Sequence, residues 1–171
     1  MKPDRAVRVL IVEDSPIVHA VLRRNLAAIP NVAVAGAAFT GRSGIVAIRQ
    51  LEPDAVLLDL TMPDGDGFDV LTAIRGDAHQ PLFVIVTFHS DETMRDRCFE
   101  LGAHIFIDKA RDTDRLFALL ARLGSGETTV EQEKAASLPD NERGPAERHA
   151  PADLPRRPFT PPSAEPPRLR R

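Results

Sequence analysis

Asp59 is the residue whose position in the sequence most clearly suggests chemistry. It directly follows the apolar run Ala55–Leu58, and a loop rich in proline, glycine and aspartate follows it. Because open parallel sheets bind ligands at the carboxyl ends of their strands, a carboxylate here is placed to meet a ligand that enters from solvent. Three further apolar runs also end in polar side chains, namely Glu13 with Asp14, Thr87, and Lys109. We therefore expect acids, a hydroxyl and an amine along one edge of a sheet.

Glu13, Asp14 and Asp59 form a cluster of three carboxylates if these strand ends meet. Such acids raise one another's pKa values unless a cation lies between them. Mg²⁺ prefers hard oxygen ligands and keeps open positions for water and phosphate. The alternative is that Glu13 and Asp14 are solvated loop acids that interact with the dipole of the following helix. The presence of Asp59, Thr87 and Lys109 at corresponding strand ends favours the metal site.

Lys109 and Thr87 add a cation and a hydroxyl to the same edge. The ammonium can offset the acids and pair with a phosphoryl oxygen, and the hydroxyl can donate a hydrogen bond to one. Taken singly, Lys109 is typical of a surface lysine, and Thr87 of a strand residue whose hydroxyl is satisfied. Together with a carboxylate nucleophile at Asp59 and a divalent metal, they indicate a phosphoryl-transfer site.

Residues 6–123 contain two hydrophobic patterns in turn, and these patterns predict the strands and helices that position the polar groups. Short apolar runs, typical of buried strands, alternate with stretches in which apolar residues stand four apart, as in helices. Since those runs are mostly apolar rather than alternating between apolar and polar residues, they suit a parallel sheet that is covered on both faces. We expect a doubly wound (βα)5 domain of the α/β class with five parallel strands. The predicted strands cover residues 7–12, 32–37, 55–58, 82–86 and 105–107.

Residues that cap helices mark several of the expected helix starts. Ser15 precedes a proline and then an apolar stripe that begins with Ile17 and Val21, so we expect it to be the N-cap of the first helix. Ser90 and Asp112 are the expected N-caps of the fourth and fifth helices.

The composition changes at residue 124 of the 171-residue chain. Residues 124–171 contain nine of the 15 prolines, equal numbers of acidic and basic residues, and few large apolar side chains. Such a segment buries too little apolar surface to offset its ordering entropy, so we expect a disordered tail without a second folded output domain. Residues 156–171 are basic, and their spaced prolines suit a polyproline II ligand or an inert, stiff linker.

Charge and cysteine content exclude several classes of protein. Residues 1–123 are mildly acidic, which argues against direct binding of nucleic acid. The apolar run at residues 9–12 is too short for a signal peptide or a membrane span. The single cysteine, Cys98, excludes an internal disulfide and fits a reducing compartment, where it would pack in the core. We therefore expect a cytoplasmic protein.

The motifs resemble those of the CheY-like receiver domain of two-component response regulators. The resemblance covers about residues 6–123 and implies a flavodoxin-like fold. Since residues 124–171 show no second periodic core, we expect a stand-alone receiver. The resemblance rests on Glu13 with Asp14, Asp59 with Met62-Pro63 and Gly67, Thr87, and Lys109.

The resemblance implies that Asp59 accepts a phosphoryl group from a histidine kinase or a phosphotransfer protein. Glu13, Asp14 and Asp59 would hold Mg²⁺ together with the backbone carbonyl of Thr61. The domain would be no enzyme in the ordinary sense, because it would catalyse only its own phosphorylation and dephosphorylation.

The resemblance also implies a conformational switch. Phosphorylation adds negative charge and acceptor oxygens, so Thr87 would move toward the phosphoryl group and Phe106 would turn into the space it leaves. Phe106 could equally be a fixed packing residue. The surface formed by the fourth helix, the last strand and the last helix would then change and bind a partner protein, or a second copy of the chain in a homodimer.

Three positions depart from the family pattern or vary within it. Ala110 replaces the proline that usually follows the lysine, often with a cis peptide, so this loop has either another shape or a strained peptide bond. Thr61 and His89 occupy positions that tune the lifetime of the phosphoryl group in this family. We hypothesise that His89 affects hydrolysis of the aspartyl phosphate; the alternative is an exposed loop histidine.

Three other functions fit the sequence less well. Haloacid-dehalogenase-type phosphatases also use a strand-end aspartate, but they need a second aspartate where Thr61 stands, and their metal acids come late in the chain. A dinucleotide-binding domain needs a glycine-rich first turn, which is missing after Glu13 and Asp14. A receiver that is never phosphorylated and serves only as an interaction module stays open, although the complete set of acids, threonine and lysine argues against it.

Overall fold

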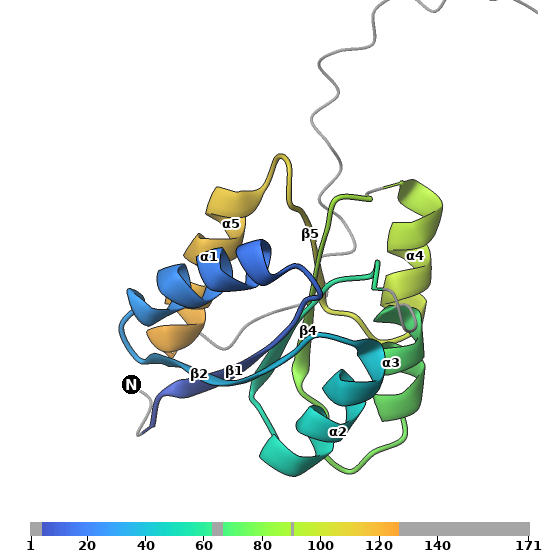
Figure 1. Cartoon of the computed structure of the whole chain (residues 1–171), viewed down its shortest axis with the longest axis horizontal. Helices are drawn as coiled ribbons and strands as arrows, with labels where there is room; N and C mark the ends of the chain where they lie inside the picture. Colours follow the sequence, from blue (N-terminus) through green and yellow to red (C-terminus); the bar gives the residue numbers. More distant parts are fainter. Residues whose placement is uncertain (1–4, 63–66, 90, 127–171) are drawn as a thin grey trace, which may run out of the picture. The chain divides into compact units, whose positions relative to one another are not determined.

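The computed structural model describes residues 5–62, 67–89 and 91–126, and strands and helices alternate along them (Figure 1). The strands form one parallel sheet in the order β2-β1-β3-β4-β5. The predicted doubly wound (βα)5 fold is therefore confirmed. The elements are β1 Val7–Val12, α1 Pro16–Ala27, β2 Val32–Ala38, α2 Gly41–Leu51, β3 Ala55–Leu58, α3 Gly67–Ile74, β4 Leu82–Thr87, α4 Glu92–Glu100, β5 Ile105–Asp108 and α5 Thr113–Gly124.

Helices cover both faces of the sheet, with α1 and α5 on one face and α2, α3 and α4 on the other (Figure 1). Successive side chains of a strand point to opposite faces, so each strand serves both layers. In β1, Leu10 packs in the cluster under α2–α4, whereas Ile11 packs under α1 and α5. In β5, Phe106 and Ile107 divide in the same way. This two-sided burial explains why the strand sequences are mostly apolar rather than alternating.

The strand order reverses between β1 and β3, because the first crossover leads outward to β2 and the later ones lead to the opposite side. In open α/β sheets such a reversal leaves a crevice outside the carboxyl ends of the two strands, and ligands bind there. The backbone N–H of Asp59 donates to the carbonyl of Val12, and that of Glu13 donates to Ala38, each at 3.0 Å. The loops that carry these acids thus stay tied to the sheet.

The helix caps agree with the sequence only in part. Ser15 caps α1 as expected, and its hydroxyl accepts the N–H of Val18. The prediction that Ser90 caps α4 is wrong: the N-cap is Asp91, whose carboxylate accepts the N–H of Met94 at 2.8 Å, while Ser90 lies outside the described residues. Asp112 holds the N-cap position of α5, but its side chain makes no capping hydrogen bond.

The apolar stripe of α1 is not wholly buried. Ile17 is 78% exposed and Val21 is 50% exposed, whereas His19, Leu22 and Leu26 form the buried side. The spacing identified the helix, but it could not distinguish an inward stripe from an outward one beside it. Cys98 is fully buried, as predicted.

None of the helices in the described part of the chain is long and apolar enough to cross a membrane. The predicted disordered tail lies, from residue 127 onward, outside the described residues.

Candidate functional site

The structure brings the three predicted acids together at the strand-order reversal. Glu13 and Asp14 follow β1, Asp59 follows β3, and carboxylate oxygens of all three lie within 4.8 Å of one another. Glu13 is only 2% exposed and Asp59 only 7%. Burial on this scale is costly for a charged carboxylate unless another charge or a hydrogen bond compensates it.

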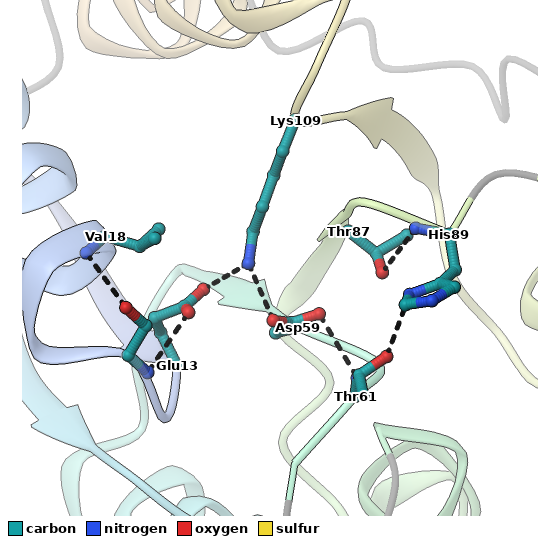
Figure 2. Close-up of polar contacts among 8 residues, drawn as sticks. Glu13, Val18, Asp59, Thr61, Thr87, His89 and Lys109 are labelled. Carbon is teal, nitrogen blue, oxygen red and sulfur yellow. Dashed lines mark hydrogen bonds and ion pairs between the residues drawn. The ribbon is translucent and has the colours of Figure 1, made fainter.

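Lys109 supplies a compensating charge. Its Nζ lies 2.5 Å from Glu13 Oε2 and 2.6 Å from Asp59 Oδ2, and its side chain is 6% exposed. Figure 2 shows the lysine extended between the two acids. Burial raises the pKa of the Glu13 carboxyl; Lys109 opposes this increase, and the charge of Asp59 adds to it.

These groups fit a divalent cation. Three carboxylates face one ammonium here, so negative charge is in excess among them. A cluster of carboxylate oxygens at a sheet edge suits Mg²⁺, which takes oxygen ligands and retains water in its open positions. The predicted fourth ligand, the carbonyl of Thr61, follows in the same loop, and the Thr61 N–H donates to Asp59 Oδ1 at 3.2 Å.

A chain of hydrogen bonds extends from Asp59 to the end of β4. Thr61 Oγ1 and His89 Nδ1 lie 3.3 Å apart, and the His89 N–H donates to Thr87 Oγ1 at 3.3 Å. Thr87 is fully buried, whereas His89 is exposed. Figure 2 shows this chain on the side of Asp59 that faces away from Glu13. Thr61 and His89 are therefore in contact as well as close to the acid.

Phe106 lies in β5 and is 5% exposed within the cluster under α2–α4. Its Cα pairs in register with Ile85, two residues before Thr87 on the neighbouring strand. The ring thus has an inward position beside the strand that carries Thr87. Whether it turns on phosphorylation stays a prediction.

The loop at Ala110 has another shape rather than a strained peptide. No peptide bond is cis in the residues that the structure describes. The Lys109 N–H donates to the carbonyl of Thr87 at 2.8 Å, and the Ala110 N–H donates to Asp108 Oδ1 at 2.7 Å. A proline in place of Ala110 has no N–H and could not make the second bond.

The surroundings of Lys109 include features that were not predicted from the sequence. The Phe88 ring is 60% exposed, and its centre lies 5.2 Å from Lys109 Nζ. A groove of about 160 Å³ opens next to it between α1 and α5. Phe88, which directly follows Thr87 in the sequence, was the only sequence signal for this groove. Its role in the groove could be recognised only from the outward position of Ile17 and Val21. The groove is lined mainly by apolar side chains, among them Ile17, Val21, Phe88 and Phe117.

Comparison with known proteins agrees with this geometry. Residues 9–121 match the response regulator receiver domain. A protein-glutamate methylesterase/protein-glutamine glutaminase of Anaeromyxobacter dehalogenans is 36% identical over 110 residues, which are 64% of this chain and 32% of that protein. The probable C4-dicarboxylate response regulator DctR of Priestia megaterium is 31% identical over 131 residues, 76% of this chain and 57% of the relative. The chain thus spans about a third of the methylesterase relatives.

Solved structures show the same fold. The signal receiver domain of the response regulator NarL from Mycobacterium tuberculosis superposes with a TM-score of 0.65 at 25% identity, covering 71% of this chain and 98% of that domain. The sheet order, the acids at its reversal and the match over residues 9–121 lead to one conclusion. The chain belongs to the response regulator receiver domain family.

Proposed function

We propose that Asp59 is the phosphoryl acceptor of a signalling receiver and that Lys109 and Thr87 assist the transfer. One observation carries the proposal: a buried carboxylate at the sheet edge contacts a buried ammonium and lies within a cluster of two further acids. A residue that only stabilised the fold would not need this concentration of buried charge, since apolar packing would be as stable or more so.

In the proposed reaction an Asp59 oxygen bonds to phosphorus while the bond between phosphorus and the donor nitrogen breaks. The donor imidazole leaves and recovers its proton from solvent. Lys109 can exchange its contact with Asp59 Oδ2 for a phosphoryl oxygen. The Thr87 hydroxyl accepts the His89 N–H through a lone pair, so its own proton can be donated to another phosphoryl oxygen.

Glu13, Asp14, Asp59 and the carbonyl of Thr61 would hold Mg²⁺. The bound ion would offset the negative charge of the phosphoryl oxygens that approach the acids. The excess negative charge of the cluster supports this assignment.

We propose that the phosphodonor is a histidine kinase or a phosphotransfer protein that contacts the groove between α1 and α5. The groove is apolar, its exposed residues include Ile17 and Phe88, and Lys109 is part of its lining as well as of the acid site. A protein seated there would have its phosphohistidine next to Asp59. The variant Ile17→Asp should then slow transfer from phosphorylated kinases, while transfer from a small phosphodonor stays unchanged.

The proposed output is a change in the surface of α4, β5 and α5, which a partner protein or a second copy of the chain would bind. Phe106 and Thr87 lie on neighbouring strands next to that surface, which supports a coupled movement. We propose a cytoplasmic protein, because a sequence with a single cysteine cannot form an internal disulfide and fits a reducing compartment. The similarity to the methylesterases covers only about a third of their length, so it does not support a methylesterase activity for this chain.

An unphosphorylated interaction module is the competing function, and intact-mass spectrometry separates the two. The protein is incubated with phosphoramidate and Mg²⁺, alongside Asp59→Asn and the matched control Asp114→Asn, whose aspartate is exposed in the first turn of α5. We expect one phosphoryl group on the wild type and on Asp114→Asn, and none on Asp59→Asn. A wild type that gains no mass would favour the interaction module.

A further inference from the structure

The end of β5 carries a carboxylate, that of Asp108, which has no part in the proposed reaction. Asp108 is the last residue of the strand and is only 8% exposed. It pairs in register with Thr87 and directly precedes Lys109. Asp108 is therefore the neighbour of Thr87 across the sheet and of Lys109 along the chain, but it is not part of the acid cluster of Glu13, Asp14 and Asp59.

Asp108 closes the turn that follows β5. Its carbonyl accepts the N–H of Arg111 at 3.2 Å and that of Asp112 at 2.8 Å. Its Oδ1 accepts the N–H of Ala110 at 2.7 Å. An aspartate at the first position of a turn commonly binds the N–H two residues on, and a charged acceptor makes such a bond stronger than a neutral one.

This turn sets the point from which the Lys109 side chain starts. The Lys109 N–H is held by Thr87, its carbonyl accepts the Thr113 hydroxyl at 3.1 Å, and the next N–H is held by Asp108. From there a flexible four-carbon stem must place the ammonium within 2.6 Å of Asp59. Because the stem is flexible, fixing the backbone at its start narrows the range of positions that the ammonium can occupy.

We propose that Asp108 is a positioning residue whose carboxylate locks the Lys109–Ala110 turn and so aims Lys109 at Asp59. The inference rests on the proposed function of Asp59. It also explains how the turn is restrained without the proline that usually follows the lysine. The Ala110 N–H donates a hydrogen bond to the Asp108 carboxylate, and a proline at position 110 could not donate it.

Kinetics of Asp59 phosphorylation test the assignment in Asp108→Ala and Asp108→Asn. At saturating phosphoramidate and Mg²⁺ we expect Asp108→Ala to be about ten- to a hundredfold slower, the usual effect of a misplaced catalytic group. The half-saturating Mg²⁺ concentration should stay unchanged, because the acid cluster is intact. Asp108→Asn retains an oxygen that accepts the Ala110 N–H, so its rate should stay within about fivefold of the wild type.

The double variant Asp108→Ala with Lys109→Ala separates positioning from a general structural role. If Asp108 acts through Lys109, the second substitution makes the first one silent, and the double variant matches Lys109→Ala. An equal slowing by Asp108→Ala with and without Lys109, or no slowing at all, would overturn the inference. Unfolding temperatures of all variants show whether they fold.

Acetylation of Lys109 gives a readout that does not depend on phosphorylation. The chain has three lysines, so Lys2 and Lys134 serve as internal references in peptide mass spectrometry. Lys109 is nearly buried, and releasing the turn should increase its acetylation rate at least about threefold in Asp108→Ala but not in Asp108→Asn. If the wild type accepts no phosphoryl group, the proposed function fails, whereas equal acetylation of wild type and Asp108→Ala contradicts the role of Asp108.

Discussion

Replacing Lys109 by methionine should reveal how strongly the acid cluster depends on its ammonium. The substitution keeps an unbranched side chain but removes a charge that lies 2.5 Å from Glu13 and 2.6 Å from Asp59, two acids that are 2% and 7% exposed. Removing one partner from a buried ion pair typically costs about 3–5 kcal/mol. We expect the lower end, about 3 kcal/mol, because Glu13 can become neutral by binding a proton.

The pH and the metal should both change this cost. Burial already raises the pKa of Glu13, and loss of the opposing lysine raises it further, so the deficit of Lys109→Met should shrink as the pH falls and Glu13 is protonated. Mg²⁺ should also reduce the deficit, since a bound cation can replace part of the missing charge. At pH 8 in EDTA, a loss of about 3 kcal/mol in a folded part of this size corresponds to an unfolding temperature about 12 °C lower.

Circular dichroism is the suitable probe, because the chain has no tryptophan or tyrosine for intrinsic fluorescence. Urea and thermal unfolding would be measured in EDTA at pH 8 and pH 5.5, and again with Mg²⁺. Lys109→Arg is the matched control, which keeps the charge and should lose less stability than the methionine variant. Equal unfolding free energies for wild type and Lys109→Met at pH 8 in EDTA would refute the view that Lys109 compensates buried acids.

Three further predictions concern the site and its frame. A Cβ at Gly67 would lie 2.6 Å from the carbonyl oxygen of Asp59, so Gly67→Ala should lower the free energy of unfolding by about 2 kcal/mol and slow phosphorylation of Asp59. Gly76→Ala is the control, because a Cβ there meets nothing within 4 Å. Equal stability of the two variants would argue against crowding at Gly67. Burial lowers the pKa of His104, whose Nδ1 accepts the Phe83 N–H, so its neutral form contributes stability that is complete above the unfolded pKa near 6.5 and is lost as the pH falls through the lower, folded pKa. His104→Asn should therefore show a shallower loss of unfolding free energy between pH 7.5 and 5, and an unchanged slope would contradict this. His89→Ala removes the contact with Thr61 beside Asp59 and should change the dephosphorylation rate of the labelled protein, whereas an unchanged rate would show that His89 is only a loop residue.

The strands and the sheet were predictable because two-sided burial leaves a direct trace in the sequence. The run at residues 55–58 is apolar at every position since both faces of β3 are covered, and Asp59 marks its end. The convergence of Glu13, Asp14 and Lys109 on that edge follows from parallel strands alone. These predictions needed only the period of the pattern and the positions where it stops.

Details that depend on rotation or on turn geometry were not predictable. The outward position of Ile17 is set by how α1 packs on the sheet, and the groove beside Phe88 exists only because of that rotation. Asp108 was not predicted as part of the site, because its bond to Ala110 becomes apparent only once the turn after β5 is known. The cap at Asp91 was missed because serine and aspartate are almost equally good N-caps and stand next to each other.

Locating the transferred phosphoryl group on the chain decides whether Asp59 is a signalling acceptor. The protein would be labelled with phosphoramidate and Mg²⁺, reduced with borohydride to convert any aspartyl phosphate into a stable derivative, and digested for peptide mass spectrometry. We expect the modification at Asp59 alone, dependent on Mg²⁺ and strongly reduced in Lys109→Ala. Label at another residue, or label that persists in Asp59→Asn, would contradict the assignment of Asp59 as the acceptor.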